Sequence, residues 1–249
     1  MPELSLLLLA APAILFAGIA KGGFANGPTF AATPLLALVL PPAEAVALML
    51  PMLMVMDVTA LRAWWRHWDM GLARAMVIGA LPGIALGALL FGSLPAAPVQ
   101  GAIGALALVF VAYQTARTLR WIEVPQVGRS SAPLWGGILG FSSFVTHAGG
   151  PPAAIYLLSR GLDKRTFQST SVVIFAAVNA IKFVVYLALG LFTAETTVSV
   201  VLLAPVAIVG TLIGVWAHAH ISERAFFLFA HIMLALAGAK LLHTALVGG

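Results

Sequence analysis

An apolar run from residue 132 to residue 158 is interrupted by the heptapeptide THAGGPP, residues 146–152. Glycine is unfavourable inside a helix, and proline lacks the backbone N–H and clashes with the preceding turn. We therefore expect one helix to end here and another to begin at the prolines. In a bilayer, the freed backbone groups must face protein or a water-filled cavity, so the break predicts a site. The first turn of the second helix favours an anion.

A second interruption, AKGGFANGP at residues 20–28, lies between the apolar runs 4–19 and 30–40. Each run is short for a membrane span, which needs about 20 residues. We expect Lys21, Gly22 and Gly23 to interrupt the helix, so that the segment forms a hairpin of two short helices.

The composition places these runs in a lipid bilayer. Hydrophobic residues make up 61% of the 249 residues and charged residues 8%, whereas about 25% of residues are charged in soluble domains. The chain has almost no polar linker, so we expect one membrane domain. The net charge of +5 does not indicate nucleic-acid binding, because the basic residues lie in short loops between apolar runs. Glu3 and the lack of a positive leader predict no cleaved signal peptide.

Metal and cofactor chemistry has little support in the sequence. There are no cysteines, which excludes disulfides, thiolate metal sites and cysteine nucleophiles. The histidines at 218, 220, 231 and 243 show no convincing metal spacing, and no carboxylate cluster joins them. We expect no metal site, no cofactor and no enzymatic activity.

Six further apolar runs have the length of membrane spans: residues 43–65, 73–91, 99–119, 167–191, 198–217 and 225–245. The two halves of the chain correspond at an offset of about 122 residues, which pairs Gly18 with Gly140 and Asp57 with Asn179. We therefore predict an all-α integral membrane protein of two repeats, each a broken or re-entrant helical hairpin plus three transmembrane helices. The predicted division is residues 1–119 for the first repeat, 120–131 for a cytoplasmic linker and 132–249 for the second repeat.

The basic residues test this count. If each broken segment returns to the side from which it entered, ten of the 13 Lys and Arg fall in loops on one side of the membrane. If each were a single crossing, the cluster at 160–165 would lie opposite the cluster at 117–129, against the positive-inside rule. The hairpin alternative therefore predicts an inverted-topology repeat, with the arginine-rich loops in the cytoplasm of a bacterial cell and both termini on the opposite side of its inner membrane. Paired broken helices of this kind form the binding sites of many secondary transporters.

Two stretches resemble the TauE/SafE (TSUP) family of sulfite and organosulfonate exporters. GFSSFVTHAGGPPAAIYLL, residues 140–158, is similar to the glycine-proline motif of the family's second half, and GIAKGGFANGPTFAATPLLAL, residues 18–38, to the glycine-rich motif of its first half. The first motif is poorer in glycine than is usual in the family. The resemblance implies export of a small sulfur oxyanion or sulfonate, driven by the proton gradient.

Candidate substrate-binding residues lie in the two breaks and on one later span. They are Lys21, Gly22, Gly23, Asn26, Gly27, Ser142, Ser143, Thr146, His147, Gly149, Gly150 and Lys182. A charged side chain inside a membrane segment is costly and by default functional, and the glycines would allow the backbone to approach a ligand closely. Structural alternatives stay open: snorkelling or helix-end pairing for the lysines, backbone hydrogen bonds for the hydroxyls, and helix packing for the glycines.

Asp57 and His147 are the candidates for proton coupling. Asp57 is the one carboxylate deep within a span, and it is either a proton relay or the counter-ion of Lys21, Arg62 or Lys182. His147 is either a proton carrier, because its reference pKa of about 6.5 is near physiological pH, or a neutral donor to loop carbonyls.

These features predict a secondary transporter that works by alternating access on a small anion and uses protons. An anion channel of the same fold is the first alternative. A membrane-embedded enzyme, with Asp57 and His147 as its only candidate pair, is the second. The sequence does not predict the oligomeric state.

Overall fold

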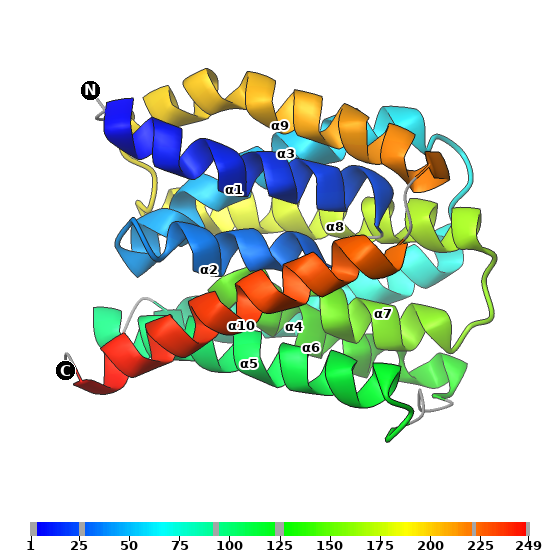
Figure 1. The fold of residues 1–249 in the computed structure, drawn as a ribbon. Coiled ribbons are helices and arrows are strands. Elements are labelled where there is room, and N and C mark those ends of the chain that lie inside the picture. Colours follow the sequence, from blue (N-terminus) through cyan, green and yellow to red (C-terminus); the bar gives the residue numbers. More distant parts are fainter. Residues whose placement is uncertain (1–3, 25–27, 92–94, 123–126, 221–222, 248–249) are drawn as a thin grey trace.

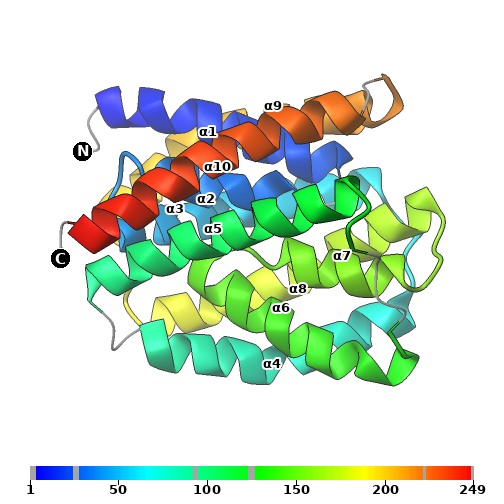
Figure 2. The same ribbon diagram turned by 60° about the horizontal axis from the view of Figure 1, so that its bottom comes forward.

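The computed structural model describes residues 4–24, 28–91, 95–122, 127–220 and 223–247. Helices lie side by side along one main direction (Figures 1 and 2). In chain order they are α1 (Leu4–Gly23), the 3₁₀ helix η1 (Pro28–Ala31), α2 (Ala32–Leu36), α3 (Pro42–Ala63), α4 (Met70–Phe91), α5 (Ala96–Thr118), the 3₁₀ helix η2 (Arg129–Ser131), α6 (Ala132–Thr146), α7 (Gly150–Leu158), α8 (Lys164–Ala188), α9 (Ala194–His220) and α10 (Glu223–Val247). The prediction of an all-α protein is confirmed, since the described residues contain no strand.

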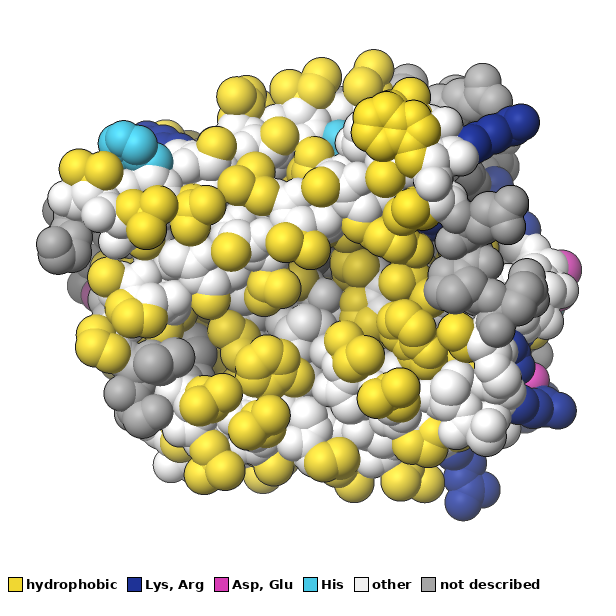
Figure 3. Space-filling view, turned by 90° about the horizontal axis from the view of Figure 1, so that it is seen from below, with side chains coloured by type: hydrophobic (Ala, Val, Ile, Leu, Met, Phe, Trp, Pro, Cys, Tyr) yellow, Lys and Arg dark blue, Asp and Glu magenta, His cyan; other side chains and the backbone are white. Residues whose placement is uncertain are grey.

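Within the described ranges, six helices are long and apolar enough to cross a membrane, namely α3, α4, α5, α8, α9 and α10. The apolar part of α1, Leu7–Gly23, is shorter than these six. Hydrophobic side chains cover the face seen in Figure 3, and most of the Lys and Arg side chains in that view gather at one end. Such a surface suits a protein whose apolar face contacts lipid and whose basic groups lie at a water-facing end.

The break at THAGGPP is confirmed. Helix α6 ends at Thr146 and α7 begins at Gly150, with Pro151 in its first turn. His147 follows α6 in the left-handed conformation, with φ 58°, and its N–H donates to the carbonyl of Ser143, which is a common way to end a helix. The chain then turns back, and α7 returns toward the end from which α6 entered (Figures 1 and 2).

The predicted interruption at Lys21 to Gly23 is wrong, because α1 continues through all three residues. A Cβ added to Gly22 would collide with the backbone of Thr211, and one added to Gly23 with the backbone of Gly214. The two glycines therefore let α1 and α9 pack backbone to backbone, which stabilises helix association in membranes. This contact favours the helix in spite of the low helix propensity of glycine.

The contacts between helices are equivalent in the two halves of the chain. Helix α1 packs on α9 and α4 packs on α6, while α3 packs on α8 and α5 on α10. Suppose that α1 corresponds to α6, α3 to α8, α4 to α9 and α5 to α10. The α1–α9 pair is then equivalent to the α6–α4 pair, and the α3–α8 and α5–α10 pairs each join two corresponding helices. Corresponding helices also run in opposite directions (Figures 1 and 2). An inverted repeat would produce this arrangement.

The two ends of the bundle differ. The start of α1 and the end of α10 lie at one end, and the last turns of α3, α5, α7 and α9 at the other (Figures 1 and 2). At that second end Asp163 caps α8 by accepting hydrogen bonds from the N–H groups of Arg165 and Thr166. A hydrogen bond from the side chain of Thr166, together with these two backbone bonds, holds the pKa of Asp163 below its usual value.

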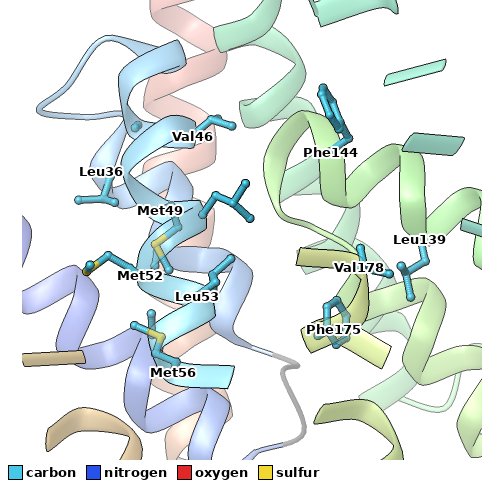
Figure 4. Close-up of a cluster of buried hydrophobic side chains, with 14 of the residues drawn as sticks. Leu36, Val46, Met49, Met52, Leu53, Met56, Leu139, Phe144, Phe175 and Val178 are labelled. Carbon is cyan, nitrogen blue, oxygen red and sulfur yellow. The ribbon is translucent and has the colours of Figure 1, made fainter. Parts of the chain in front are cut away.

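The core lies between α3 and the second half of the chain. Figure 4 shows side chains of α3 facing side chains of α6 and α8. On α3, Leu53 points toward the second half, whereas Met52 points away from it, and the labelled side chains across from α3 are Leu139, Phe144, Phe175 and Val178. Methionine fills irregular gaps well, so this contact between the halves is apolar around a small polar centre.

Candidate functional site

A chain of buried polar side chains links three helices at the centre of the bundle. Lys21 Nζ on α1 lies 2.7 Å from Asp57 Oδ1 on α3. The amide of Asn179 on α8 donates to Asp57 Oδ2 at 2.8 Å. One turn further along α8, Lys182 donates to Asn179 Oδ1 at 3.4 Å. Lys21, Asp57, Asn179 and Lys182 are all at most 3% exposed.

Lys182 connects this chain to the second break. Its Nζ donates to Ser143 Oγ at 3.1 Å and lies 2.7 Å from His147 Nδ1. The other ring nitrogen of His147, Nε2, lies 3.0 Å from the carbonyl oxygen of Val46 on α3. Because a carbonyl only accepts, Nε2 carries a proton. When Lys182 is an ammonium it can only donate, so Nδ1 then accepts from it and His147 is a neutral imidazole.

Helical spacing explains how these groups meet. Phe175, Asn179 and Lys182 lie on one face of α8, because residues three and four apart are neighbours on a helix surface. Ser143 lies one turn before His147, at the end of α6. Lys21 Nζ is also 5.7 Å from the centre of the Phe175 ring, a distance at which a cation is attracted to an aromatic face.

The charges do not balance across the site. Asp57 is the salt-bridge partner of Lys21, and among the described residues no carboxylate forms a salt bridge with Lys182. Lys182 is 0% exposed, and its three partners are neutral. With both lysines protonated, the buried groups carry one positive charge in excess.

A small cavity adjoins this centre. Its walls are formed by Lys21, Thr29, Leu53, Ser143, His147, Gly150, Phe175 and Asn179, and it has room for about one water molecule. Lys182 lies behind this wall and touches three of its members. The pairs Lys21 with Ser143 and Leu53 with Phe175 are both separated by the repeat offset, so each half of the chain contributes to the wall.

The structure brings together part of the predicted binding set. Lys21, Ser143, His147 and Gly150 line the cavity, and Lys182 contacts two of them. Gly149 lies against Ser143 and Phe175, where an added Cβ would crowd both side chains.

Other predicted residues lie elsewhere. Gly22 and Gly23 pack against α9. The hydroxyl of Ser142 donates to the carbonyl of Ile138, and the hydroxyl of Thr146 to the carbonyl of Ser142, which is the backbone alternative for both. The predicted residues Asn26 and Gly27 lie outside the described residues.

Two polar members of the site were missed as binding residues in the sequence. Asn179 could have been predicted, because it is the repeat counterpart of Asp57. Two counterpart residues contact each other when they lie near the two-fold axis that relates the repeats. Thr29 had none, because its counterpart is Pro151. In the described part of the chain no group of three or more His, Asp or Glu gathers.

Comparison with known proteins identifies a family. The family model described as Sulfite exporter TauE/SafE matches residues 10–241, a range that includes both breaks and the cavity wall. No curated protein and no solved structure matches the chain.

Proposed function

Since this chain belongs to the sulfite exporter TauE/SafE family, we propose that it exports a small sulfur-containing anion, such as sulfite, sulfoacetate or another organosulfonate, as a proton-coupled secondary transporter. The family match supports membrane transport as the activity and argues against an enzyme. We place the protein in the inner membrane of a bacterial cell, with the arginine-rich loops in the cytoplasm and both termini on the opposite side.

Lys182 is the observation that carries this proposal. A buried ammonium group is costly unless a partner compensates its charge, and Lys182 meets only neutral acceptors among the described residues. Intramembrane ionisable residues mark substrate pathways by default. An anion in the adjacent cavity would supply the missing negative charge.

The remaining donors suit a sulfur oxyanion. Ser143 offers a hydroxyl, and α7 directs its positive end toward the cavity at Gly150. Pro151 and Pro152 have no N–H, so the start of α7 can offer only the amides of Gly149 and Gly150. Sulfite and sulfonates present three oxygens and can accept from several of these groups together.

The cavity has room for about one water molecule in this structure. A sulfonate needs more room, so the hairpin tips must move apart when the anion enters. So narrow a centre also supports a transporter over an open anion channel, which would need a continuous water-filled path.

Two matched hydrogen bonds support alternating access. Trp64 Nε1, at the end of α3, donates to the carbonyl of Gly22 on α1 at 3.0 Å. Tyr186 OH, at the end of α8, donates to the carbonyl of Phe144 on α6 at 2.5 Å. Both donors and both acceptors are related by the repeat offset of 122 residues. Because α3 and α8 run in opposite directions, the two bonds lie toward opposite ends of the bundle.

These two bonds, which we call the end locks, each join a broken hairpin to the first spanning helix of its own half. With both locks closed, the site is shut on both sides. Release of one lock at a time would expose the cavity to one side at a time, as rocking of two inverted repeats requires. We take residues 1–119 and 132–249 as these repeats and residues 120–131 as the linker.

Proton coupling is proposed at His147 and Asp57. His147 contacts Lys182, and Asp57 contacts Lys21, so a proton gained at either group changes the charge beside the anion. A proton on His147 would also break its hydrogen bond from Lys182 and free that ammonium for the substrate.

Transport assays in proteoliposomes test the proposal. We expect radiolabelled sulfite to accumulate under a pH gradient and to exchange faster when unlabelled sulfite is present on the opposite side. Failure to move sulfite, sulfoacetate or methanesulfonate under either direction of pH gradient would contradict the proposal. Movement that ignores both the pH gradient and the opposite-side anion would indicate a channel instead.

A further inference from the structure

We propose that Thr29 is an additional anion-binding residue, which donates its hydroxyl hydrogen to an oxygen of the transported sulfite or sulfonate. This inference rests on the proposed function and adds a specific contact from the first broken hairpin. Thr29 belongs to η1, directly after the first break, and it lines the cavity beside Lys21.

The hydroxyl of Thr29 is buried and has no partner in the described part of the chain. Thr29 is 5% exposed, and its Oγ1 makes no hydrogen bond to any described residue. Leaving a buried hydroxyl unsatisfied is costly, and native proteins seldom do so without a reason. A hydroxyl that hydrogen-bonds a ligand would be unpaired in the ligand-free protein, and the adjacent cavity can hold part of such a ligand.

Other threonines show what Thr29 lacks. Thr59, Thr146 and Thr211 each donate to the carbonyl four residues earlier in their own helix, the usual way for a helical hydroxyl to be satisfied in an apolar setting. Thr29 is the second residue of η1, which begins at Pro28, so no helical turn of η1 precedes it to provide that carbonyl. The position of the break therefore leaves the hydroxyl available.

The other donors at the cavity belong mainly to the second half of the chain. Ser143, His147 and Gly150 all come from the second break, and Lys182 approaches from α8. From the first half, Lys21 is already paired with Asp57. Thr29 would add an uncommitted donor from the first hairpin, so that one anion is held by both hairpin tips. Such a contact would place the bound anion between the two tips.

Thr33 provides a matched control on the neighbouring turn. It is 0% exposed, and its hydroxyl also has no partner among the described residues. Unlike Thr29, it is absent from the cavity wall. Replacing either residue with valine removes the hydroxyl and keeps the branched shape, so the two variants differ mainly in whether the lost hydroxyl adjoins the cavity.

The test measures binding of sulfite and methanesulfonate to the purified full-length protein in detergent. We expect Thr29→Val to weaken both by about 10- to 150-fold, the range for a hydrogen bond to a charged group. Thr33→Val should stay within about twofold of wild type, and Thr29→Ser, which restores the hydroxyl, should bind nearly as well as wild type. Size-exclusion profiles and melting temperatures verify that each variant is folded.

The outcomes separate this inference from the proposed function. If wild type binds and Thr29→Val binds equally well, or if Thr29→Val and Thr33→Val lose affinity equally, the role of Thr29 is refuted while the transporter proposal stands. If Thr29→Val does not fold, the inference is judged on Thr29→Ser and Thr29→Ala, and wild-type affinity in the alanine variant refutes it. If wild type binds neither anion, both proposals fall.

Discussion

Replacing Lys182 with methionine removes the buried ammonium that has no carboxylate partner, and keeps an unbranched side chain of similar length. The lost contact is a hydrogen bond between two charged groups, worth about 1.5–3 kcal/mol. That range corresponds to anion binding weakened by about 10- to 150-fold. The ligand-free protein should lose little stability, because the cost of burying the charge disappears together with its three hydrogen bonds to neutral partners.

Calorimetric titration and melting curves in detergent provide the measurement. Wild type should melt at a higher temperature as sulfite is added, because ligand that binds only the folded state stabilises it. Lys182→Met should melt near the wild-type temperature without sulfite and gain much less with it. Lys240→Met is the control, because Lys240 lies within α10 and is exposed.

Wild-type sulfite affinity in Lys182→Met would refute the role given to the unpaired ammonium. A variant that fails to fold, while Lys240→Met folds normally, would instead show that Lys182 holds the structure together. In that case Lys182→Arg, which keeps the positive charge, should fold and retain part of the affinity. Failure of the arginine variant to bind would count against anion recognition by charge.

Four further predictions follow from the same geometry. Replacing only one member of the Lys21–Asp57 pair should cost about 3–5 kcal/mol of folding free energy. Combining Lys21→Met with Asp57→Leu should cost less than the sum of the two single changes, measured by unfolding in mixed detergent micelles. Strict additivity would mean that the pair does not interact. Asp57→Asn should flatten the dependence of transport rate on pH, and an unchanged profile would remove Asp57 from proton coupling. Trp64→Phe and Tyr186→Phe should open opposite ends of the cavity, because each removes one end lock. The chain has no cysteine, so single-cysteine probes labelled from either side can measure this, and equal labelling in both variants would count against alternating access. Gly83→Leu should prevent folding, since even an added Cβ would collide with the backbone of Gly137 on α6; normal expression and melting of this variant would contradict the packing given for α4 and α6.

Local chemistry made the helices and the second break predictable. Long apolar runs specify spans whatever their neighbours are, and two glycines followed by Pro151 and Pro152 favour the start of a new helix over the interior of a continuous one. The first break was misplaced by a few residues because Gly22 and Gly23 tolerate a helix as well as a turn. The packing of α9 against them decides the outcome, and that contact is not visible in the sequence of α1.

The sequence predicted those site residues whose charge is costly to bury in a membrane. Lys21, Asp57 and Lys182 were identified because ions inside apolar segments are expensive. The sequence did not predict the cation that pairs with Asp57, because Lys21, Arg62 and Lys182 were all possible partners. The contact between Asp57 and Asn179 was open to prediction from the repeat. The buried hydroxyl of Thr29 was not, because only the folded chain shows that it lacks a partner.

The most direct measurement of the central claim is the position of the bound anion. Crystals of the full-length protein soaked with selenite, a heavier analogue of sulfite, would give an anomalous selenium signal. We predict a signal between the two hairpin tips, within hydrogen-bond distance of Ser143 and close to Lys182. A signal at a distant place, such as the arginine-rich end, with the central cavity unchanged at the same selenite concentration, would contradict the account.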